Sequence, residues 1–282
     1  MRKESNIMNI FRDTAKAVIK QPFTLILIGA LMLVGALLNT ILPVMPFLIG
    51  VINMTGGGVI ESVVSLLQTI MNPSIIPILL ITIAVITLIF SVVAGLLLPG
   101  YLLTVDNGLS TGGRKSGIFR ANINGSFSKF FLLTVKTVLL TVVLTLFLMV
   151  ATVPAIVVTR AAFSTNPNIL LGAMFIDLIT IGVLFMAISF FRIYVYMWYI
   201  AAAKGAPKPF KAGKAVADSL FWSMALKLLC FDLVFAVVIF LIYLSDSQLF
   251  RYFAGWIFTT AFFTTLGVYL VNSYRSCRRA NR

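Results

Sequence analysis

The residues of this chain with the clearest potential for chemistry are four charged side chains inside long apolar stretches: Asp232, Asp177, Lys136 and Lys227. A charge in membrane hydrocarbon costs about 2.5–3.5 kcal/mol even on the gentlest scale, so such residues usually serve transport or pairing between helices. At a rise of 1.5 Å per residue, Asp232 lies roughly 16 Å beyond Phe221, near the middle of an approximately 30 Å core. Asp177 lies roughly 12 Å from the outer end of its stretch by the same reckoning.

Asp232 needs a partner on another helix, or it stays protonated. Lys227 is five residues away, about 140° around a helix, and so does not share its face. Lys136 is a candidate partner, and Arg251 is a weaker one. Two interpretations stay open: Asp232 couples the movement of a proton or cation, together with Asp177, or it holds helices together. Lys136 and Lys227 lie about 9 Å from the inner ends of their stretches, shallow enough to snorkel to the interface.

Other site chemistry is scarce in this composition. The chain has no histidine, which is the commonest general base and the commonest metal ligand. Cys230 and Cys277 offer neither zinc-site spacing nor a disulfide framework. Gly108 to Ser116 imitates a phosphate-binding loop, but Arg114 displaces the lysine by one position and a membrane stretch precedes it, so we interpret it as a basic loop. We predict no catalytic residue, no metal and no cofactor.

The elements that carry these residues are predicted to be transmembrane helices. The chain is 60% hydrophobic and 11% charged, with a mean hydropathy of +1.07, whereas soluble domains carry about 25% charged residues. Six stretches have the roughly 20 apolar residues that a membrane span needs: 23–42, 75–98, 130–153, 169–191, 221–244 and 254–272. Pro99 with Gly100 is expected to end the second span, and Pro154 the third. We predict an all-α polytopic membrane protein, a single domain over 1–282, with six transmembrane helices as three hairpins and short interfacial helices.

Basic residues are segregated between these stretches. All but four of the 22 Lys and Arg residues fall into four clusters. The clusters are Arg2, Lys3, Arg12, Lys16 and Lys20; Arg114, Lys115, Arg120 and Lys129; Arg192, Lys204, Lys208, Lys211 and Lys214; and Arg275, Arg278, Arg279 and Arg282. Because cytoplasmic loops carry the excess of Lys and Arg, we predict a cell-membrane protein with both termini in the cytoplasm. The expected partners are the anionic lipid headgroups of that face and a possible partner protein, not nucleic acid, because no nucleic-acid-binding module accompanies the charge.

Three further segments are predicted at the membrane surfaces. Residues 1–22 form a cytoplasmic interfacial segment, 55–72 an outer amphipathic segment, and 273–282 a basic cytoplasmic tail. A weak repeat consists of an aromatic residue, a basic residue, ten further residues and then the aromatic residue that opens a span: IFRDTAKAVIKQPF, IFRANINGSFSKFF and PFKAGKAVADSLFW. Its basic members are Arg12, Arg120 and Lys211, the candidate cytoplasmic interfacial residues. The repeat favours three units, each an interfacial helix followed by a hairpin.

Two stretches carry a family resemblance. They are Gly100-Tyr101 through Phe131, and Ala203-Lys204-Gly205 to Phe221-Trp222. In them the chain resembles the six-span membrane domain that accompanies some bacterial glycerophosphodiester phosphodiesterases, and related uncharacterised bacterial membrane proteins. The resemblance implies architecture and no activity, since the chain has no room for the catalytic domain and no metal-binding set of carboxylates.

Three classes of function compete. The first is a non-catalytic membrane protein with an accessory, membrane-homeostasis or peptide-protection (immunity-like) role. The second is a small transporter or channel that uses Asp232 and Asp177. The third, a membrane enzyme acting on lipids, is disfavoured by the missing histidine and by only eight acidic residues.

Overall fold

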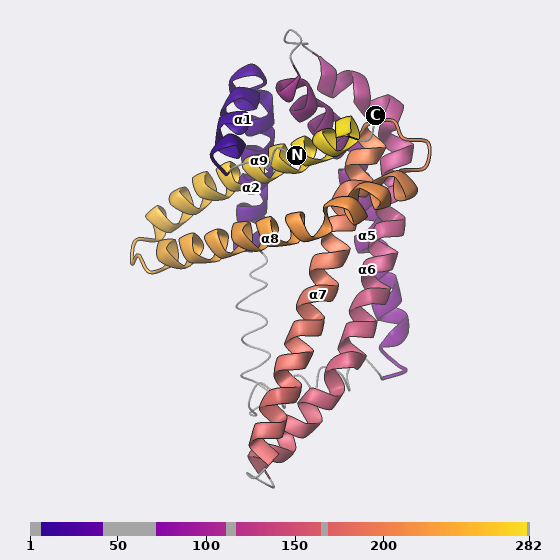
Figure 1. The fold of residues 1–282 in the computed structure, drawn as a ribbon, viewed down its shortest axis with the longest axis vertical. Coiled ribbons are helices and arrows are strands. Elements are labelled where there is room, and N and C mark those ends of the chain that lie inside the picture. Colours follow the sequence, from indigo (N-terminus) through magenta and orange to yellow (C-terminus); the bar gives the residue numbers. More distant parts are fainter. Residues whose placement is uncertain (1–6, 42–71, 111–116, 165–168, 281–282) are drawn as a thin grey trace. The chain divides into compact units, whose positions relative to one another are not determined.

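The computed structural model describes residues 7–41, 72–110, 117–164 and 169–280, and these are almost entirely helical (Figure 1). The helices are α1 (Ile7–Lys20), α2 (Phe23–Ile41), α5 (Ile76–Leu109), α6 (Ile118–Ser164), α7 (Leu170–Ala203), α8 (Pro209–Tyr243) and α9 (Gln248–Ala280). Five of them, α5 to α9, are long and apolar enough to cross a membrane, and the bent pair α1 and α2 raises the number to six. The predicted fold class, an all-α polytopic membrane protein, is confirmed. The predicted outer segment 55–72 lies, apart from its last residue, outside the described residues.

A sharp bend separates α1 from α2. The two helices meet at 97°, because Pro22 has no N–H to continue the first helix. The backbone N–H of Gln21 closes α1 on the Ala17 carbonyl at 2.8 Å, and Thr24 Oγ1 donates to the Gln21 carbonyl at 2.8 Å. α1 is amphipathic: Ile10 and Ala17 are buried, while its basic side chains are exposed or half-buried.

Two predicted helix ends are wrong. α5 continues through Pro99 to Leu109, and α6 continues through Pro154 to Ser164. Proline is tolerated inside membrane helices because neighbouring groups and local adjustments satisfy the backbone carbonyl that loses its donor. Gly100, next to Pro99, lets the ring of Phe119 pack directly on α5, since an added Cβ would overlap that ring.

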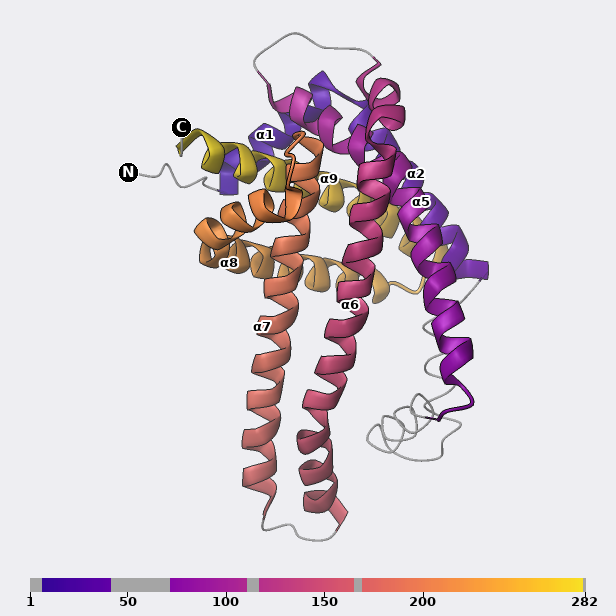
Figure 2. The same cartoon turned by 90° about the vertical axis from the view of Figure 1, so that its right-hand side faces the viewer.

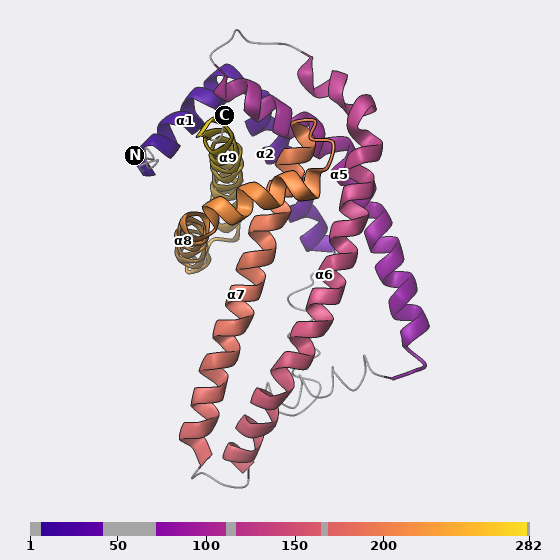
Figure 3. The ribbon, with the colours of Figure 1, turned by 45° about the vertical axis from the view of Figure 1, so that its right-hand side comes forward.

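The described residues divide into two compact units. The first contains Met1–Ile41, Val93–Phe131 and Arg192–Arg282, and α9 is its central helix. Half of the apolar window of α9 is buried, against 6–11% for the other four long helices. α9 packs against α1, α2 and α8, and it lies side by side with α8 (Figure 3). The indole N–H of Trp256 donates to the Gly29 carbonyl at 2.8 Å and so joins α9 to α2.

The second unit contains Leu42–Val92 and Leu132–Phe191. Within it α6 and α7 run alongside each other (Figure 2), and small residues are buried on both helices, namely Ala155, Ala162 and Ala173. Large apolar side chains along the rest of these helices are exposed, for example Phe147 and Phe175. An aqueous surface does not carry so much contiguous apolar area, so lipid is the natural solvent of this unit.

Gly213 of α8 lies directly against the backbone of α7. An added Cβ would come within 2.7 Å of the Trp198 nitrogen and 2.8 Å of the Met197 carbonyl oxygen. We expect Gly213→Ala to lower the free energy of unfolding by about 1–3 kcal/mol, because a backbone cannot swing aside as a side chain does. Thermal denaturation of the purified protein measures this. Gly255→Ala in α9, where nothing lies within 4 Å, is the control and should be neutral or stabilising; equal losses would contradict the prediction.

Candidate anion-binding site and interhelical polar contacts

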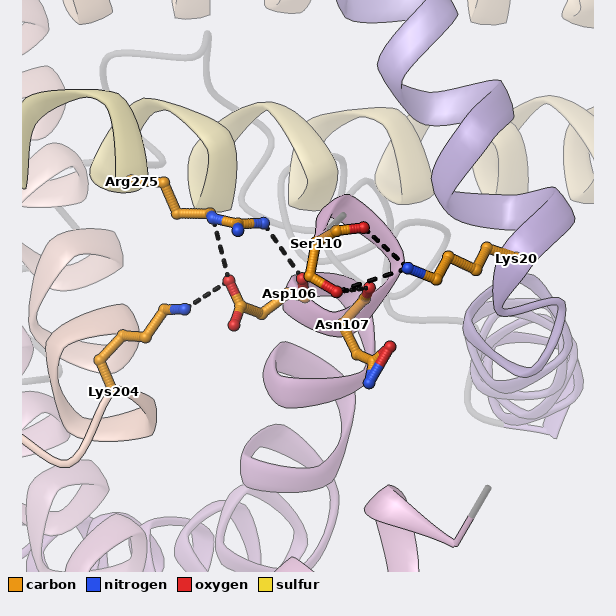
Figure 4. A network of polar contacts seen from close by, with 6 residues as sticks. All are labelled: Lys20, Asp106, Asn107, Ser110, Lys204 and Arg275. Atoms are coloured by element: carbon orange, nitrogen blue, oxygen red, sulfur yellow. Dashed lines mark hydrogen bonds and ion pairs between the residues drawn. The ribbon is translucent and has the colours of Figure 1, made fainter. Parts of the chain in front are cut away.

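Asp106, near the end of α5, is the centre of a polar network in the first unit (Figure 4). The Lys204 ammonium pairs with Asp106 Oδ1, and Nε of Arg275 from α9 lies 3.5 Å from the same oxygen. Nη1 of Arg275 also donates to the backbone carbonyl of Asp106 at 3.1 Å. The three side chains expose only 17–21% of their surface, so this attraction is screened less than at an open surface.

The end of α7 places Lys204 in this network. Gly205 adopts a φ of 73°, a left-handed conformation that glycine takes without steric cost. Its N–H donates to the Ala202 carbonyl, and the N–H of Ala206 donates to the Ala201 carbonyl, both at 3.0 Å. This is a Schellman motif, which ends a helix sharply. Lys204 is therefore the C-cap residue of α7, and the motif fixes the conformation of the backbone that carries its side chain.

A second arm of the network comes from α1. Nζ of Lys20 donates to the Ser110 carbonyl at 2.7 Å and lies 3.4 Å from Ser110 Oγ. Ser110 Oγ donates in turn to the Asn107 carbonyl at 2.7 Å. The last carbonyls of a helix have no partner inside the helix, and a lysine there also interacts favourably with the helix dipole. Lys20, the last residue of α1, thus provides a hydrogen-bond donor for a carbonyl at the end of α5.

A pocket of about 150 Å³ opens beside this network. It is lined by Lys204, Tyr274, Arg275, Arg278 and Arg279. Four of its five lining residues are cationic, and the α9 members share one side of the helix because Tyr274 with Arg278, and Arg275 with Arg279, are four residues apart. Tyr274 is buried, whereas Arg278 and Arg279 are exposed. Such a set of donors favours an anion with several oxygens.

The partner of Asp232 is Arg192, not the predicted Lys136 or Arg251. Nη1 and Nη2 of Arg192 lie 3.1 Å and 2.7 Å from Oδ1 and Oδ2 of Asp232. This fork geometry is the strongest arrangement for an ion pair of arginine and carboxylate. The side chains are 29% and 48% exposed in the chain itself. The sequence does not identify Arg192 as the partner, because the predicted fourth span ends at residue 191. In the structure α7 continues to Ala203, so Arg192 lies inside the helix.

Asp177 makes a different contact. The Thr159 hydroxyl of α6 lies 2.9 Å and 2.8 Å from its two carboxylate oxygens on α7 and donates its single proton between them. Of the predicted lysines inside spans, Lys136 is exposed and Lys227 is half-buried with a partner of its own. Asp232 and Asp177 belong to different units, and each carboxylate has its own local partner.

The three predicted interfacial residues lie near helix starts. Arg12, Arg120 and Lys211 are all exposed, in α1, in the first turn of α6 and in the first turn of α8. The repeat segments differ in one respect: the helix breaks only in the first, which alone has a proline directly before the closing aromatic residue. In the other two the helix runs without interruption into the span.

The sequence analysis did not select Asp106. The signal that could have found it is its isolation, because it is the one acidic residue between Glu61 and Asp177 and it stands between two basic clusters. Within the described part of the chain, no three carboxylate or cysteine residues are grouped closely enough to hold a metal ion.

The long apolar helices and their exposed apolar faces define a multi-pass, all-α membrane protein. Comparison with known protein families, with curated proteins and with solved structures finds no match to this chain.

Proposed function

We propose that this chain is a non-catalytic protein of the cytoplasmic membrane that acts in membrane homeostasis or in protection against membrane-active peptides. It would do so through a basic surface that contacts anionic lipid headgroups or a partner protein. The observation that carries the proposal is the placement of charge. Among the described residues, every Lys and Arg except Lys136 and Arg160 belongs to the first unit.

The exposed part of this charge forms what we call the basic surface. Its members lie on α1, α6, α8 and α9 and on the connection before α8: Arg12, Lys16, Arg120, Lys208, Lys211, Lys214, Arg278 and Arg279. Basic residues close to an anionic leaflet contribute about 1 kcal/mol each to attraction. A surface with eight of them therefore supports stable contact with headgroups without any further pocket.

The contacts of five of the six described acidic residues, all except the exposed Asp246, support a role without catalysis. Asp106 and Asp232 are in ion pairs, Asp177 accepts from Thr159, Asp13 accepts from Asn272 at 2.9 Å and Asp218 accepts from the Tyr194 hydroxyl. A general acid or base must be able to reach a substrate proton. These five carboxylates instead join segments of the chain to one another. The resemblance to the membrane domain of the phosphodiesterases stays a prediction, and it concerns the architecture of the chain and not its activity.

The cytoplasmic position of the basic surface predicts a labelling pattern. In a chain with Cys230→Ala and Cys277→Ala, single cysteines at 12, 120 and 211 should react with a membrane-impermeant maleimide only after the cells are opened. A cysteine at 160, which follows the predicted third span 130–153 and is therefore expected on the outer side, should react in intact cells. The reason is that basic loops are retained inside. The reverse pattern at 12, 120 and 211 would overturn the topology.

The role itself is tested in the cell that makes the protein. Deletion of the gene should lower survival under a membrane-active cationic peptide, and the intact chain should restore it. The variant R12Q/R120Q/K211Q should restore less, because it removes three exposed charges, whereas R160Q should restore fully. Unchanged survival in the deletion strain, together with a measurable solute flux through the purified protein in vesicles, would favour the transporter.

A small transporter or channel is the second candidate, and one observation favours it. The ion pair of Arg192 with Asp232 lies inside two long apolar helices, where ionisable residues often mark an ion pathway. A proton-coupled carrier would lose flux in Asp232→Asn while its folded yield stays normal. A pair that only holds α7 to α8 would lose folded yield in the same variant.

A further inference from the structure

The pocket at the end of α9 carries more positive charge than its neighbourhood neutralises. Asp106 is engaged with Lys204 and Arg275. Arg278 and Arg279 form no ion pair with any carboxylate in the described ranges, 7–41, 72–110, 117–164 and 169–280. Among the residues that the structure describes, four cations against one carboxylate leave an excess of three positive charges, which an anion can balance.

The size of the pocket limits the anion that fits. Its volume of about 150 Å³ exceeds the roughly 10–15 Å³ that a single water molecule needs. It is well below the roughly 300–1,000 Å³ of pockets that enclose whole organic ligands. A single phosphate group fits this space, while the rest of its molecule would have to remain outside.

The donor set indicates which phosphate. Three of the lining residues are arginines, whose forked guanidinium matches two phosphate oxygens at once. A phosphate monoester carries about −1.5 to −2 charges at pH 7 and three acceptor oxygens. A diester, such as the linkage in most phospholipid headgroups, carries a single negative charge. The local excess of positive charge is therefore matched better by the monoester.

We propose that the pocket of Lys204, Tyr274, Arg275, Arg278 and Arg279 binds the phosphate of a monoester, supplied either by a lipid headgroup or by a soluble phosphate. The inference rests on the proposed function, because it assigns one part of the contact with anionic headgroups to a defined place. Asp106 holds Lys204 and Arg275 in position before the anion arrives, and such preorganisation lowers the entropic cost of binding. Arg278 and Arg279 supply the unpaired charge.

The experiment uses the full chain in nanodiscs of phosphatidylcholine. Three probes are titrated and followed by the rise in denaturation temperature, which ligand binding to the folded state produces. They are short-chain phosphatidic acid, short-chain phosphatidylglycerol and inorganic phosphate. Wild-type protein should bind phosphatidic acid about tenfold or more tightly than phosphatidylglycerol, since one additional charge-assisted contact has about that effect.

Two double variants test whether binding depends on the pocket. R278Q/R279Q should weaken binding of phosphatidic acid by about tenfold or more. K136Q/R160Q removes the same charge from exposed residues of the second unit, outside the pocket lining and outside the basic surface. It should change the affinity by less than about twofold, because exposed charges are strongly screened. Tyr274→Phe keeps the ring and removes the hydroxyl donor. This milder variant should also weaken binding. Its denaturation temperature without probe should equal that of the wild type, which shows that the variant is folded.

The outcomes separate the two proposals. Equal losses in both double variants, or equal affinity for monoester and diester, would overturn the pocket and leave the general contact with headgroups standing. Tight binding of inorganic phosphate with no preference for the lipid would support the pocket with a soluble ligand and count against the proposed function. No binding of any probe would overturn both.

Discussion

Asp232→Asn is expected to destabilise the protein more than Arg192→Gln, and the double variant R192Q/D232N should be closer to wild type than either. The asparagine leaves Arg192 charged without its partner, and a guanidinium cannot lose its proton in a protein. The glutamine leaves a carboxylate, which can take up a proton and become neutral. The expected cost of the lone arginine is about 2.5–3.5 kcal/mol, as for a charge in a membrane helix.

The measurement is the denaturation midpoint of each variant in micelles, arranged as a double-mutant cycle. Asp177→Asn is the control, because it alters one hydrogen bond to Thr159 and should cost only about 0.5–1.5 kcal/mol. If the effects of R192Q and D232N simply add, the ion pair contributes nothing to stability. If the double variant regains the stability of the wild type but not its solute flux, the ion pair is part of a transport path.

The class of fold could be predicted because hydropathy is a local property. Each stretch of about 20 apolar residues corresponds to part of a helix, from the second stretch (α5) to the sixth (α9). Helix ends could not be predicted in the same way. Hydropathy reports which residues face lipid, whereas a helix continues for as long as its backbone is satisfied. α7 therefore runs past residue 191 to Ala203, and ends where Gly205 permits a left-handed turn.

This error in one helix end also hid the partner of Asp232. With the fourth span ended at 191, Arg192 was assigned to a cytoplasmic cluster, and Lys136 and Arg251 remained as candidates. The contact joins residues 40 positions apart, and it depends on how α7 and α8 pack. Spacing along a single helix contains no information about such a contact.

The polar network around Asp106 was missed for a related reason. Its members come from four places in the sequence, and each looks ordinary there: a lysine that ends α1, an aspartate in α5, a lysine after α7 and an arginine in α9. In the sequence, Lys20, Lys204 and Arg275 are members of basic clusters, and such clusters indicate only which side of the membrane a segment occupies. Only the fold shows that α9 crosses the first unit as its central helix and brings its basic end beside α5.

Asp106→Asn is expected to lower the free energy of unfolding by about 1.5–3 kcal/mol, the contribution of hydrogen bonds to charged groups that are partly buried. The change removes the carboxylate that holds Lys204 and Arg275. These two cations would then repel each other at the mouth of a pocket that already contains Arg278 and Arg279. Chemical denaturation of the full chain measures the loss, and faster amide exchange at residues 100–109 and 270–279 should accompany it.

The matched control is Asp246→Asn, which makes the same change of charge at an exposed residue in the connection between α8 and α9. It should have almost no effect, and equal losses in the two variants would show that net charge, not the network, is responsible. D106N/K204Q should recover part of the loss, because it removes one of the two cations left without a partner.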